Sequence, residues 1–211
     1  MLTHGFDLPR MLLLAPVILF SLTFHEFAHA WLAFRLGDPT AANAGRVSLN
    51  PLRHLDPIGT IAIFLVGFGW AKPVPVNPYF LKGQARGFAL TAVAGPAANF
   101  IAAFGFGIIY RLLDLAHVGG FLLLIATLGV YINLALAAFN LIPIPPLDGS
   151  RVVYYLLPRN LAAEYIRLEP FGMWIVLGLL LLDSRTNIIG SWMWLIVRVF
   201  GRLFAGPGFQ V

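Results

Sequence analysis

Long apolar stretches alternate with short polar segments along the whole of this chain. Five of them approach the roughly 20 residues that an α-helix needs to cross a bilayer, and they cover residues 9–36, 87–113, 120–142, 170–183 and 186–204. The stretch at 170–183 reaches that length only if its helix begins near Glu164. This pattern predicts an all-α polytopic membrane protein with about five transmembrane helices.

A shorter apolar piece, IGTIAIFLVGFG at 58–69, is too short and too rich in glycine to span. We expect it to enter the membrane and return on the same side as a re-entrant segment, although a second partial crossing nearby would serve the same topology.

Two of the polar segments resemble short strands. GRVSLN at 45–50 alternates apolar and polar residues, and so does AKPVPVN at 71–77. Pro73 and Pro75 lack backbone donors, so the second segment suits only a sheet edge. The two segments predict a small β-hairpin-like edge near the cytoplasmic side, with plain loops as the equal alternative.

Composition supports the membrane class. Of the 211 residues, 59% are hydrophobic and 11% are charged, whereas about a quarter of a soluble domain is charged. The chain has no cysteine, which excludes disulfides and thiolate metal sites. The net charge of +5 is spread without a basic run, so we expect no nucleic-acid partner. We expect one domain over 1–211, with a core at 9–160 and C-terminal helices at 161–204.

Ionisable residues interrupt the first apolar stretch. FHEFAHA at 24–30 contains the pattern HExxH, and on a helix this spacing places His25 and His29 on one face with Glu26 beside them. Both imidazoles can then bind one Zn²⁺, while Glu26 acts as general base toward the water that the zinc activates. Charged groups at membrane depth are costly, so a functional role is favoured over a purely structural histidine pair.

A catalytic zinc site usually has a third protein ligand. Asp148 is the best candidate because it follows a full span, in FNLIPIPPLDGSR at 139–151. The prolines of this segment forbid a regular helix, so the backbone must unwind where protein or water surrounds it. Gly149 would permit the turn that aims the carboxylate inward. The alternative is an ordinary loop aspartate that caps the next helix.

The paired motifs resemble the site-2 protease family of intramembrane zinc metalloproteases. Beside HEFAHA and NLIPIPPLDG, the pieces RVSLNPLRHLDPIGT, FGWAKPVPVN and AGPAANF resemble its bacterial and archaeal branch, which has a bare membrane core without PDZ or CBS domains. The resemblance covers residues 20–160. It implies one Zn²⁺ held by His25, His29 and Asp148, with Glu26 as catalytic base and Asn140 in contact with substrate.

Three further residues are candidates for the site. Gly95 and Asn99, in AGPAANF, could give room for a polar pocket that contacts substrate, although helix packing is the more ordinary role for Gly95. His54, in LNPLRHLDP, could serve as a substrate gate or an extra ligand. A structural loop histidine is the favoured reading of His54.

Bringing His25 and Asp148 to one depth requires their two spans to run in the same direction. Basic residues agree with this topology and place the site toward the cytoplasmic face; they are Arg35, Arg46, Arg53, Lys72, Lys82, Arg86, Arg151, Arg159, Arg167, Arg198 and Arg202. We therefore expect a multi-pass protein of the cell membrane whose partners are the lipid bilayer and transmembrane protein substrates.

The function expected from these features is hydrolysis of a peptide bond within or near a transmembrane helix. A zinc-binding scaffold or regulator without protease activity would keep the ligands but would not need Glu26. A transporter would share the broken helices and buried ionisable groups, but it predicts two related halves, and the chain shows no internal duplication.

Overall fold

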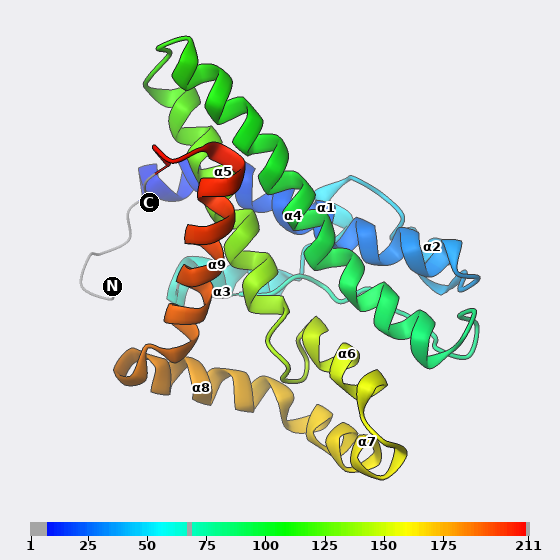
Figure 1. The fold of residues 1–211 in the computed structure, drawn as a ribbon. Helices are drawn as coiled ribbons and strands as arrows, with labels where there is room; N and C mark the ends of the chain where they lie inside the picture. The colour runs from blue at the N-terminus through cyan, green and yellow to red at the C-terminus, as the bar shows by residue number, and fades with distance from the viewer. Residues whose placement is uncertain (1–7, 67–68, 210–211) are drawn as a thin grey trace.

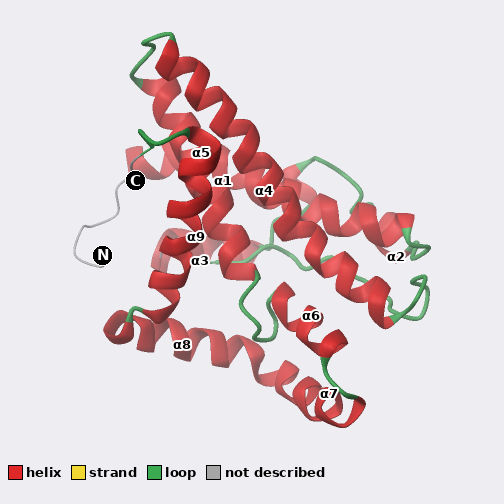
Figure 2. Ribbon diagram, in the orientation of Figure 1, coloured by secondary structure: helices red, strands yellow, loops and turns green. Residues whose placement is uncertain are grey.

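The computed structural model describes residues 8–66 and 69–209 and contains no β-strand within them (Figure 2). The α-helices are α1 (Leu8–Arg35), α2 (Thr40–Asn43), α3 (Pro57–Val66), α4 (Ala85–Leu115), α5 (Phe121–Asn140), α6 (Asp148–Leu156), α7 (Arg159–Tyr165), α8 (Gly172–Thr186) and α9 (Ile188–Ala205). Two short 3-10 helices are η1 (Pro51–Arg53) and η2 (Ile166–Phe171).

Five helical segments are long and apolar enough to cross a membrane, which confirms the predicted class. They are Leu13–Arg35, Ala85–Leu115, Phe121–Asn140, Arg159–Thr186 and Ile188–Ala205. The fourth begins well before the predicted 170–183 because α7, η2 and α8 follow one another without an extended break. Pro170, inside η2, tightens this span locally without ending it.

The spans α1, α4, α5 and α9 form the packed part of the molecule. Figure 1 shows α4 and α5 as a long hairpin with α1 crossing behind it and α9 along α5. Ala103 of α4, Val130 and Leu134 of α5, and Val197 of α9 meet in the apolar core. In contrast, only 11% of the residues in the apolar window of Arg159–Thr186 are buried, against 44% in α4. Most of the α8 surface is therefore available to lipid.

Small residues let the spans approach closely. The buried face of α4 consists almost wholly of glycine, alanine and other small residues, as is usual where membrane helices pack without a hydrophobic driving force. At Gly107 an added Cβ would lie 2.8 Å from the backbone of Phe204 on α9. The contact between α4 and α9 therefore depends on the missing side chain.

The predicted β-hairpin-like edge is not confirmed. Residues 45–50 and 71–77 form no strand; the only pairing near them in the described chain is one antiparallel bridge between Leu55 and Ala71. Side chains bond some of the backbone groups that a ladder between these segments would use. Arg46 donates to the carbonyls of Lys72 and Pro73, and the Asp38 carboxylate accepts from the N–H of Asn77.

The short apolar piece forms α3, which has ten residues and is about half of spanning length. The segments before and after α3 lie next to each other, because Leu55 pairs with Ala71 and the N–H of Lys72 donates to the carbonyl of His54 at 2.8 Å. This proximity agrees with a segment that enters and returns. Residues 67–68 of the predicted 58–69 piece lie outside the described residues.

The proline-rich segment after α5 is non-helical at 141–147, as its sequence predicts. A new helix, α6, starts at Asp148. Gly149 is helical and does not form the turn expected of it, but an added Cβ would lie 2.3 Å from the carbonyl oxygen of Leu141. Its lack of a side chain lets α6 begin directly against the end of α5.

Candidate metal centre and catalytic site

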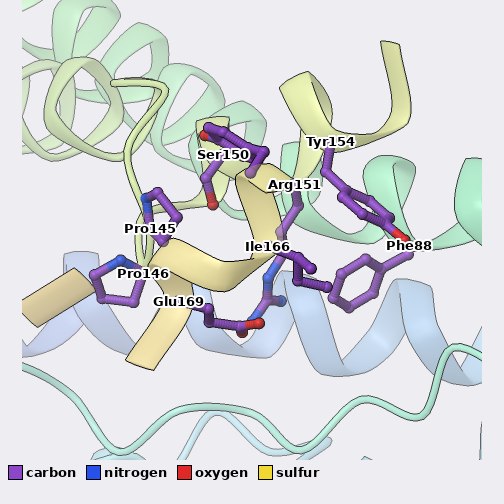
Figure 3. Close-up of a pocket in the computed structure, with 9 residues that line it drawn as sticks. Phe88, Pro145, Pro146, Ser150, Arg151, Tyr154, Ile166 and Glu169 are labelled. Atoms are coloured by element: carbon purple, nitrogen blue, oxygen red, sulfur yellow. The ribbon is translucent and has the colours of Figure 1, made fainter. Parts of the chain in front are cut away.

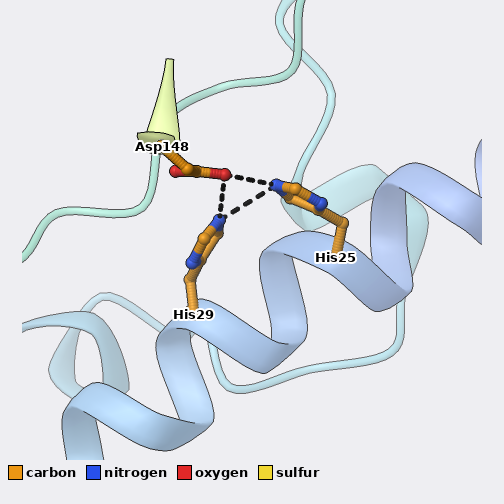
Figure 4. Close-up of side chains that lie close together, drawn as sticks. All are labelled: His25, His29 and Asp148. Atoms are coloured by element: carbon orange, nitrogen blue, oxygen red, sulfur yellow. Dashed lines mark hydrogen bonds and ion pairs between the residues drawn. The ribbon is translucent and has the colours of Figure 1, made fainter. Parts of the chain in front are cut away.

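Two histidines of α1 and the first residue of α6 meet in the interior of the molecule (Figure 4). His25 Nε2 lies 3.1 Å from Asp148 Oδ2, and His29 Nε2 lies 3.2 Å from the same oxygen. The two Nε2 atoms are 3.0 Å apart. All three residues are buried. The structure thus brings together residues that are 123 positions apart in sequence.

Hydrogen bonds on the far side of each ring define which nitrogen carries the proton. His29 Nδ1–H donates to the carbonyl oxygen of Thr91 at 2.7 Å, and a carbonyl can only accept. His25 Nδ1–H donates to Asn99 Oδ1 at 2.6 Å. In the neutral rings both Nε2 atoms therefore present lone pairs.

This donor set fits a zinc ion. Two Nε2 lone pairs and a carboxylate oxygen that face one another at 3.0–3.2 Å repel each other unless a proton or a metal cation lies among them, and the three atoms together are the donor set that a metal ion needs. Two imidazoles and one carboxylate, with the far ring nitrogens hydrogen-bonded, are the ligands and supports that catalytic zinc sites use.

Asn99 lies behind the histidines rather than at a substrate surface. Its side chain is 0% exposed, accepts from His25, and donates to the Ser21 carbonyl at 3.2 Å and to Asn133 Oδ1 at 2.8 Å. These bonds occupy both the oxygen and the nitrogen of the Asn99 amide. The geometry therefore favours support of His25 over the expected contact with substrate.

Gly95 faces the metal-binding ends of both imidazoles. A Cβ added to Gly95 would lie 2.3 Å from His29 Nε2 and 2.5 Å from His25 Nε2. The bare backbone of α4 thus closes one side of the ligand cluster. Neither Gly95 nor Asn99 lines the large cavity described next. The position of Gly95 therefore favours a role in leaving space for the two imidazole rings.

A cavity of about 550 Å³ opens on the other side of the cluster. His25, Glu26, His29 and Asp148 line it, and so does Asn140, whose amide donates to the Leu136 carbonyl at 3.0 Å. The remaining wall is mostly apolar and comes mainly from α1, α5, α8 and the 69–76 segment, with Pro146, Leu147, Arg151 and Met193 completing it. Glu26 and Asn140 therefore share one cavity with the ligand cluster.

A second, much smaller pocket of about 40 Å³ lies behind α6 (Figure 3). Arg151 and Glu169 both line it, and the Arg151 guanidinium lies 4.7 Å from the ring centroid of Phe88 on α4. Arg151 also lines the large cavity. Its stacking on Phe88 holds the helix that carries Asp148 against α4.

His54 is a loop residue away from the ligand cluster. Its ring is 1% exposed; Nε2–H donates to the Ser48 carbonyl at 2.7 Å, and Nδ1 faces an Arg46 nitrogen at 3.4 Å. The group able to hold a metal contains His25, His29 and Asp148 and does not include His54. The contacts agree with the structural role favoured for this histidine.

Three residues near the site were not singled out from the sequence: Thr91, Asn133 and Arg46. Thr91 and Asn133 are fully buried polar residues within predicted spans. A polar side chain inside an apolar stretch is a signal for function or helix contact, and this signal could have found both. Arg46 acts through the backbone groups of a distant loop, which no local pattern reveals.

Comparisons with known proteins agree with this chemistry. The family model described as peptidase family M50 matches residues 108–182. The chain is 37% identical over 214 residues to a Bacillus subtilis (strain 168) protein named "Putative zinc metalloprotease YwhC", covering 94% of this chain and 95% of that protein.

More distant relatives carry similar names. A Mycolicibacterium smegmatis protein named "Putative zinc metalloprotease Rip2" is 34% identical over 80% of this chain and 66% of its own length. One from Methanocaldococcus jannaschii, "Putative zinc metalloprotease MJ0611", is 31% identical over 74% of this chain and 69% of its own length. No solved structure matches the chain.

Substitution of Gly95 by alanine should weaken metal binding. The added methyl group would lie against both Nε2 atoms, so one or both rings must rotate away from the position they share with Asp148. We expect Gly95→Ala, purified in detergent, to lose at least half of the zinc per chain measured by atomic emission. Gly105→Ala is the matched control on α4, since nothing lies within 4 Å of that position. Equal zinc content in the two variants would contradict the close approach.

Proposed function

This chain belongs to the site-2 protease family, peptidase family M50, and we propose that it hydrolyses a peptide bond within or near a transmembrane helix of membrane protein substrates. It is a zinc metalloprotease with five apolar helices. The observation that carries the proposal is the position of Glu26: it lines the same cavity as the ligand cluster, among the spans rather than outside them.

We assign the metal to His25 Nε2, His29 Nε2 and one oxygen of Asp148. Zinc bound there supplies Lewis-acid chemistry, which activates water for attack and polarises the carbonyl under attack. Thr91 and Asn99 orient the two rings through Nδ1. Glu26 has no part in holding the ion, so its presence distinguishes a hydrolase from a scaffold that only binds zinc.

Glu26 moves the proton during hydrolysis. Its carboxylate takes a proton from the attacking water as the new C–O bond forms at the scissile carbonyl. The carboxylic acid then returns that proton to the leaving nitrogen as the C–N bond breaks. The water is divided between the new carboxyl and the new amine, and Glu26 ends in its starting state. Asn140, at the cavity wall, is placed to hydrogen-bond the substrate backbone.

The substrate must unwind locally, because the carbonyls of a transmembrane helix are hydrogen-bonded within the helix. Of the two segments that resemble short strands in sequence, 71–77 is favoured as the one that receives the extended peptide, because Pro73, Val74 and Val76 line the cavity, whereas no residue of 45–50 does. The side chains of Arg46 and Asp38 bond the carbonyls of residues 72 and 73 and the N–H of Asn77. Neither side chain bonds the N–H of Val74 or Val76, and these two groups can pair with an extended peptide.

Charge distribution supports a site near the cytoplasmic face of the cell membrane. Lys82 precedes α4, Arg86 lies in its first turn, and Arg151 follows Asp148 on the same side of the α4–α5 hairpin. The opposite turn, 116–120, carries His117 and no lysine or arginine. Arg202 does not follow the expected pattern, because α9 ends beside the far end of α4, where Arg111 donates to the Leu203 carbonyl. An excess of basic residues marks the cytoplasmic side.

Replacing Glu26 by glutamine should abolish cleavage and spare the metal. Loss of a general base typically lowers the rate by about 10²–10⁴-fold, while the three ligand atoms are unchanged. The measurement is cleavage of a membrane-spanning reporter in liposomes, with zinc content determined on the same preparations. A glutamine variant that cuts the reporter at the wild-type rate would rule out this role, and transport without cleavage by the wild type would favour the transporter.

Proline at position 76 should impair substrate use through the loss of one backbone donor. A single hydrogen bond of about 0.5–1.5 kcal/mol corresponds to a roughly 2–10-fold lower kcat/KM for the reporter. Val76→Ala is the control because it shortens the side chain and keeps the N–H. If the proline and alanine variants cut the reporter equally well, pairing at this residue does not occur.

The orientation can be tested with single cysteines, since the chain has none of its own. Gly119→Cys, in the α4–α5 turn, should react with a membrane-impermeant maleimide applied to intact cells. Lys82→Cys, at the other end of α4, should react only after the membrane is permeabilised. The reverse pattern would place the zinc site at the outer face.

A further inference from the structure

A directional line of hydrogen bonds crosses three spans and ends at His25. Asn133 on α5 and Asn99 on α4 are both 0% exposed, and Asn99 Nδ2–H donates to Asn133 Oδ1 at 2.8 Å. Asn99 Oδ1 accepts from His25 Nδ1–H at 2.6 Å. Asn133 neither lines the large cavity nor belongs to the ligand cluster, so the reaction chemistry described above leaves it without a role.

We propose that Asn133 is a positioning residue for the metal site, which acts on His25 through Asn99. By accepting from Asn99, it holds the amide oxygen of Asn99 toward the imidazole. The proton then stays on His25 Nδ1, and the lone pair of Nε2 stays directed at the metal position. This inference rests on the proposed function, in which His25 Nε2 is a zinc ligand.

The direction in which these hydrogen bonds are donated is set at Asn133, the residue farthest from His25. Asn133 Nδ2–H donates to the carbonyl oxygen of Gly129 at 2.8 Å, and a backbone carbonyl has no hydrogen to give. Asn133 must therefore offer its oxygen to Asn99, and Asn99 must offer its own oxygen to His25. A rotated Asn99 amide would present its NH₂ group to Nδ1, move the proton to Nε2 and remove the lone pair that a metal needs.

The two histidines obtain the same tautomer by different means. His29 is fixed directly, because its Nδ1–H donates to the Thr91 carbonyl. His25 has no backbone carbonyl at Nδ1 and has instead an amide that could face either way. Asn99 also donates to the Ser21 carbonyl, but at the longer distance of 3.2 Å. Asn133 therefore supplies the stronger of the two constraints on the orientation of the amide.

A purely structural account would treat the two asparagines as a polar contact that joins α4 and α5. The two accounts differ in how variants combine. If Asn133 acts through Asn99, removing Asn133 should have no further effect once Asn99 is gone, whereas independent packing effects should multiply in binding constants.

The test measures zinc affinity by competition with a chelator for full-length protein in detergent. We expect Asn99→Leu and Asn133→Leu each to raise the zinc dissociation constant by about 10-fold or more, and the double variant to match Asn99→Leu alone. Thr127→Val is the control: it removes a hydroxyl on α5 that bonds only the Leu123 carbonyl, and it should bind zinc like the wild type. Should Asn133→Leu fail to fold, Asn133→Ala removes the same acceptor without added bulk.

Nitrogen NMR of ¹⁵N-histidine in the zinc-free protein reports the tautomer directly, and the chain has only 5 histidines to assign. Wild-type His25 should be protonated at Nδ1, and Asn133→Leu should populate the Nε2–H form, a change that altered packing alone would not produce. Wild-type affinity in Asn133→Leu, an unchanged tautomer, or multiplied effects in the double variant would overturn the inference. Zinc binding that survives His25→Ala would instead refute the proposed metal site.

Discussion

The structure depends on one electrostatic constraint: three metal-binding atoms must face one another inside the membrane-spanning part of the chain. Two imidazole nitrogens and a carboxylate oxygen at 3.0–3.2 Å form an arrangement that a shared proton or a metal cation makes favourable. The surrounding protein keeps these atoms from turning away. A backbone carbonyl and an amide bond the far nitrogens of the rings, and the lack of a side chain at Gly95 lets the backbone of α4 lie against both Nε2 atoms without displacing them.

Helix α5 contributes to this constraint at two levels. In its middle, Asn133 reaches His25 through Asn99. At its end, the chain unwinds through the proline-rich segment and delivers Asp148 at the start of α6. Gly149 lets α6 start close to the end of α5, since α6 begins against the Leu141 carbonyl. Thus the first and third ligands in sequence both take their positions from one span.

Much of this arrangement could be predicted because its signals are local. Apolar length indicates the spans, and the HExxH spacing places two histidines on one helical face. Prolines 143, 145 and 146 mark the break that precedes Asp148. The zinc cofactor and the protease family are confirmed by the comparisons. The roles of individual residues at the site stay predictions.

The parts that were missed depend on contacts between distant segments. The alternation at 71–77 suggested a strand, but Arg46 and Asp38 take the backbone groups that would have formed its ladder. Asn99 was expected to help form a polar pocket because it lies in the small-residue piece AGPAANF; its contacts on α1 and α5 favour support of His25. No spacing rule within one helix could have revealed these partners.

The cavity that holds the ligand cluster is open to the surface of the molecule, so it can receive a segment of a longer substrate. A transmembrane helix hydrogen-bonds its carbonyls internally, so it must fray before one of them can reach Glu26 and the ligand cluster. Selectivity can therefore arise before any side chain is recognised, from the ease with which a candidate helix frays. A glycine in the substrate helix, which destabilises the helix by about 1 kcal/mol relative to alanine, would mark the point at which it unwinds most easily.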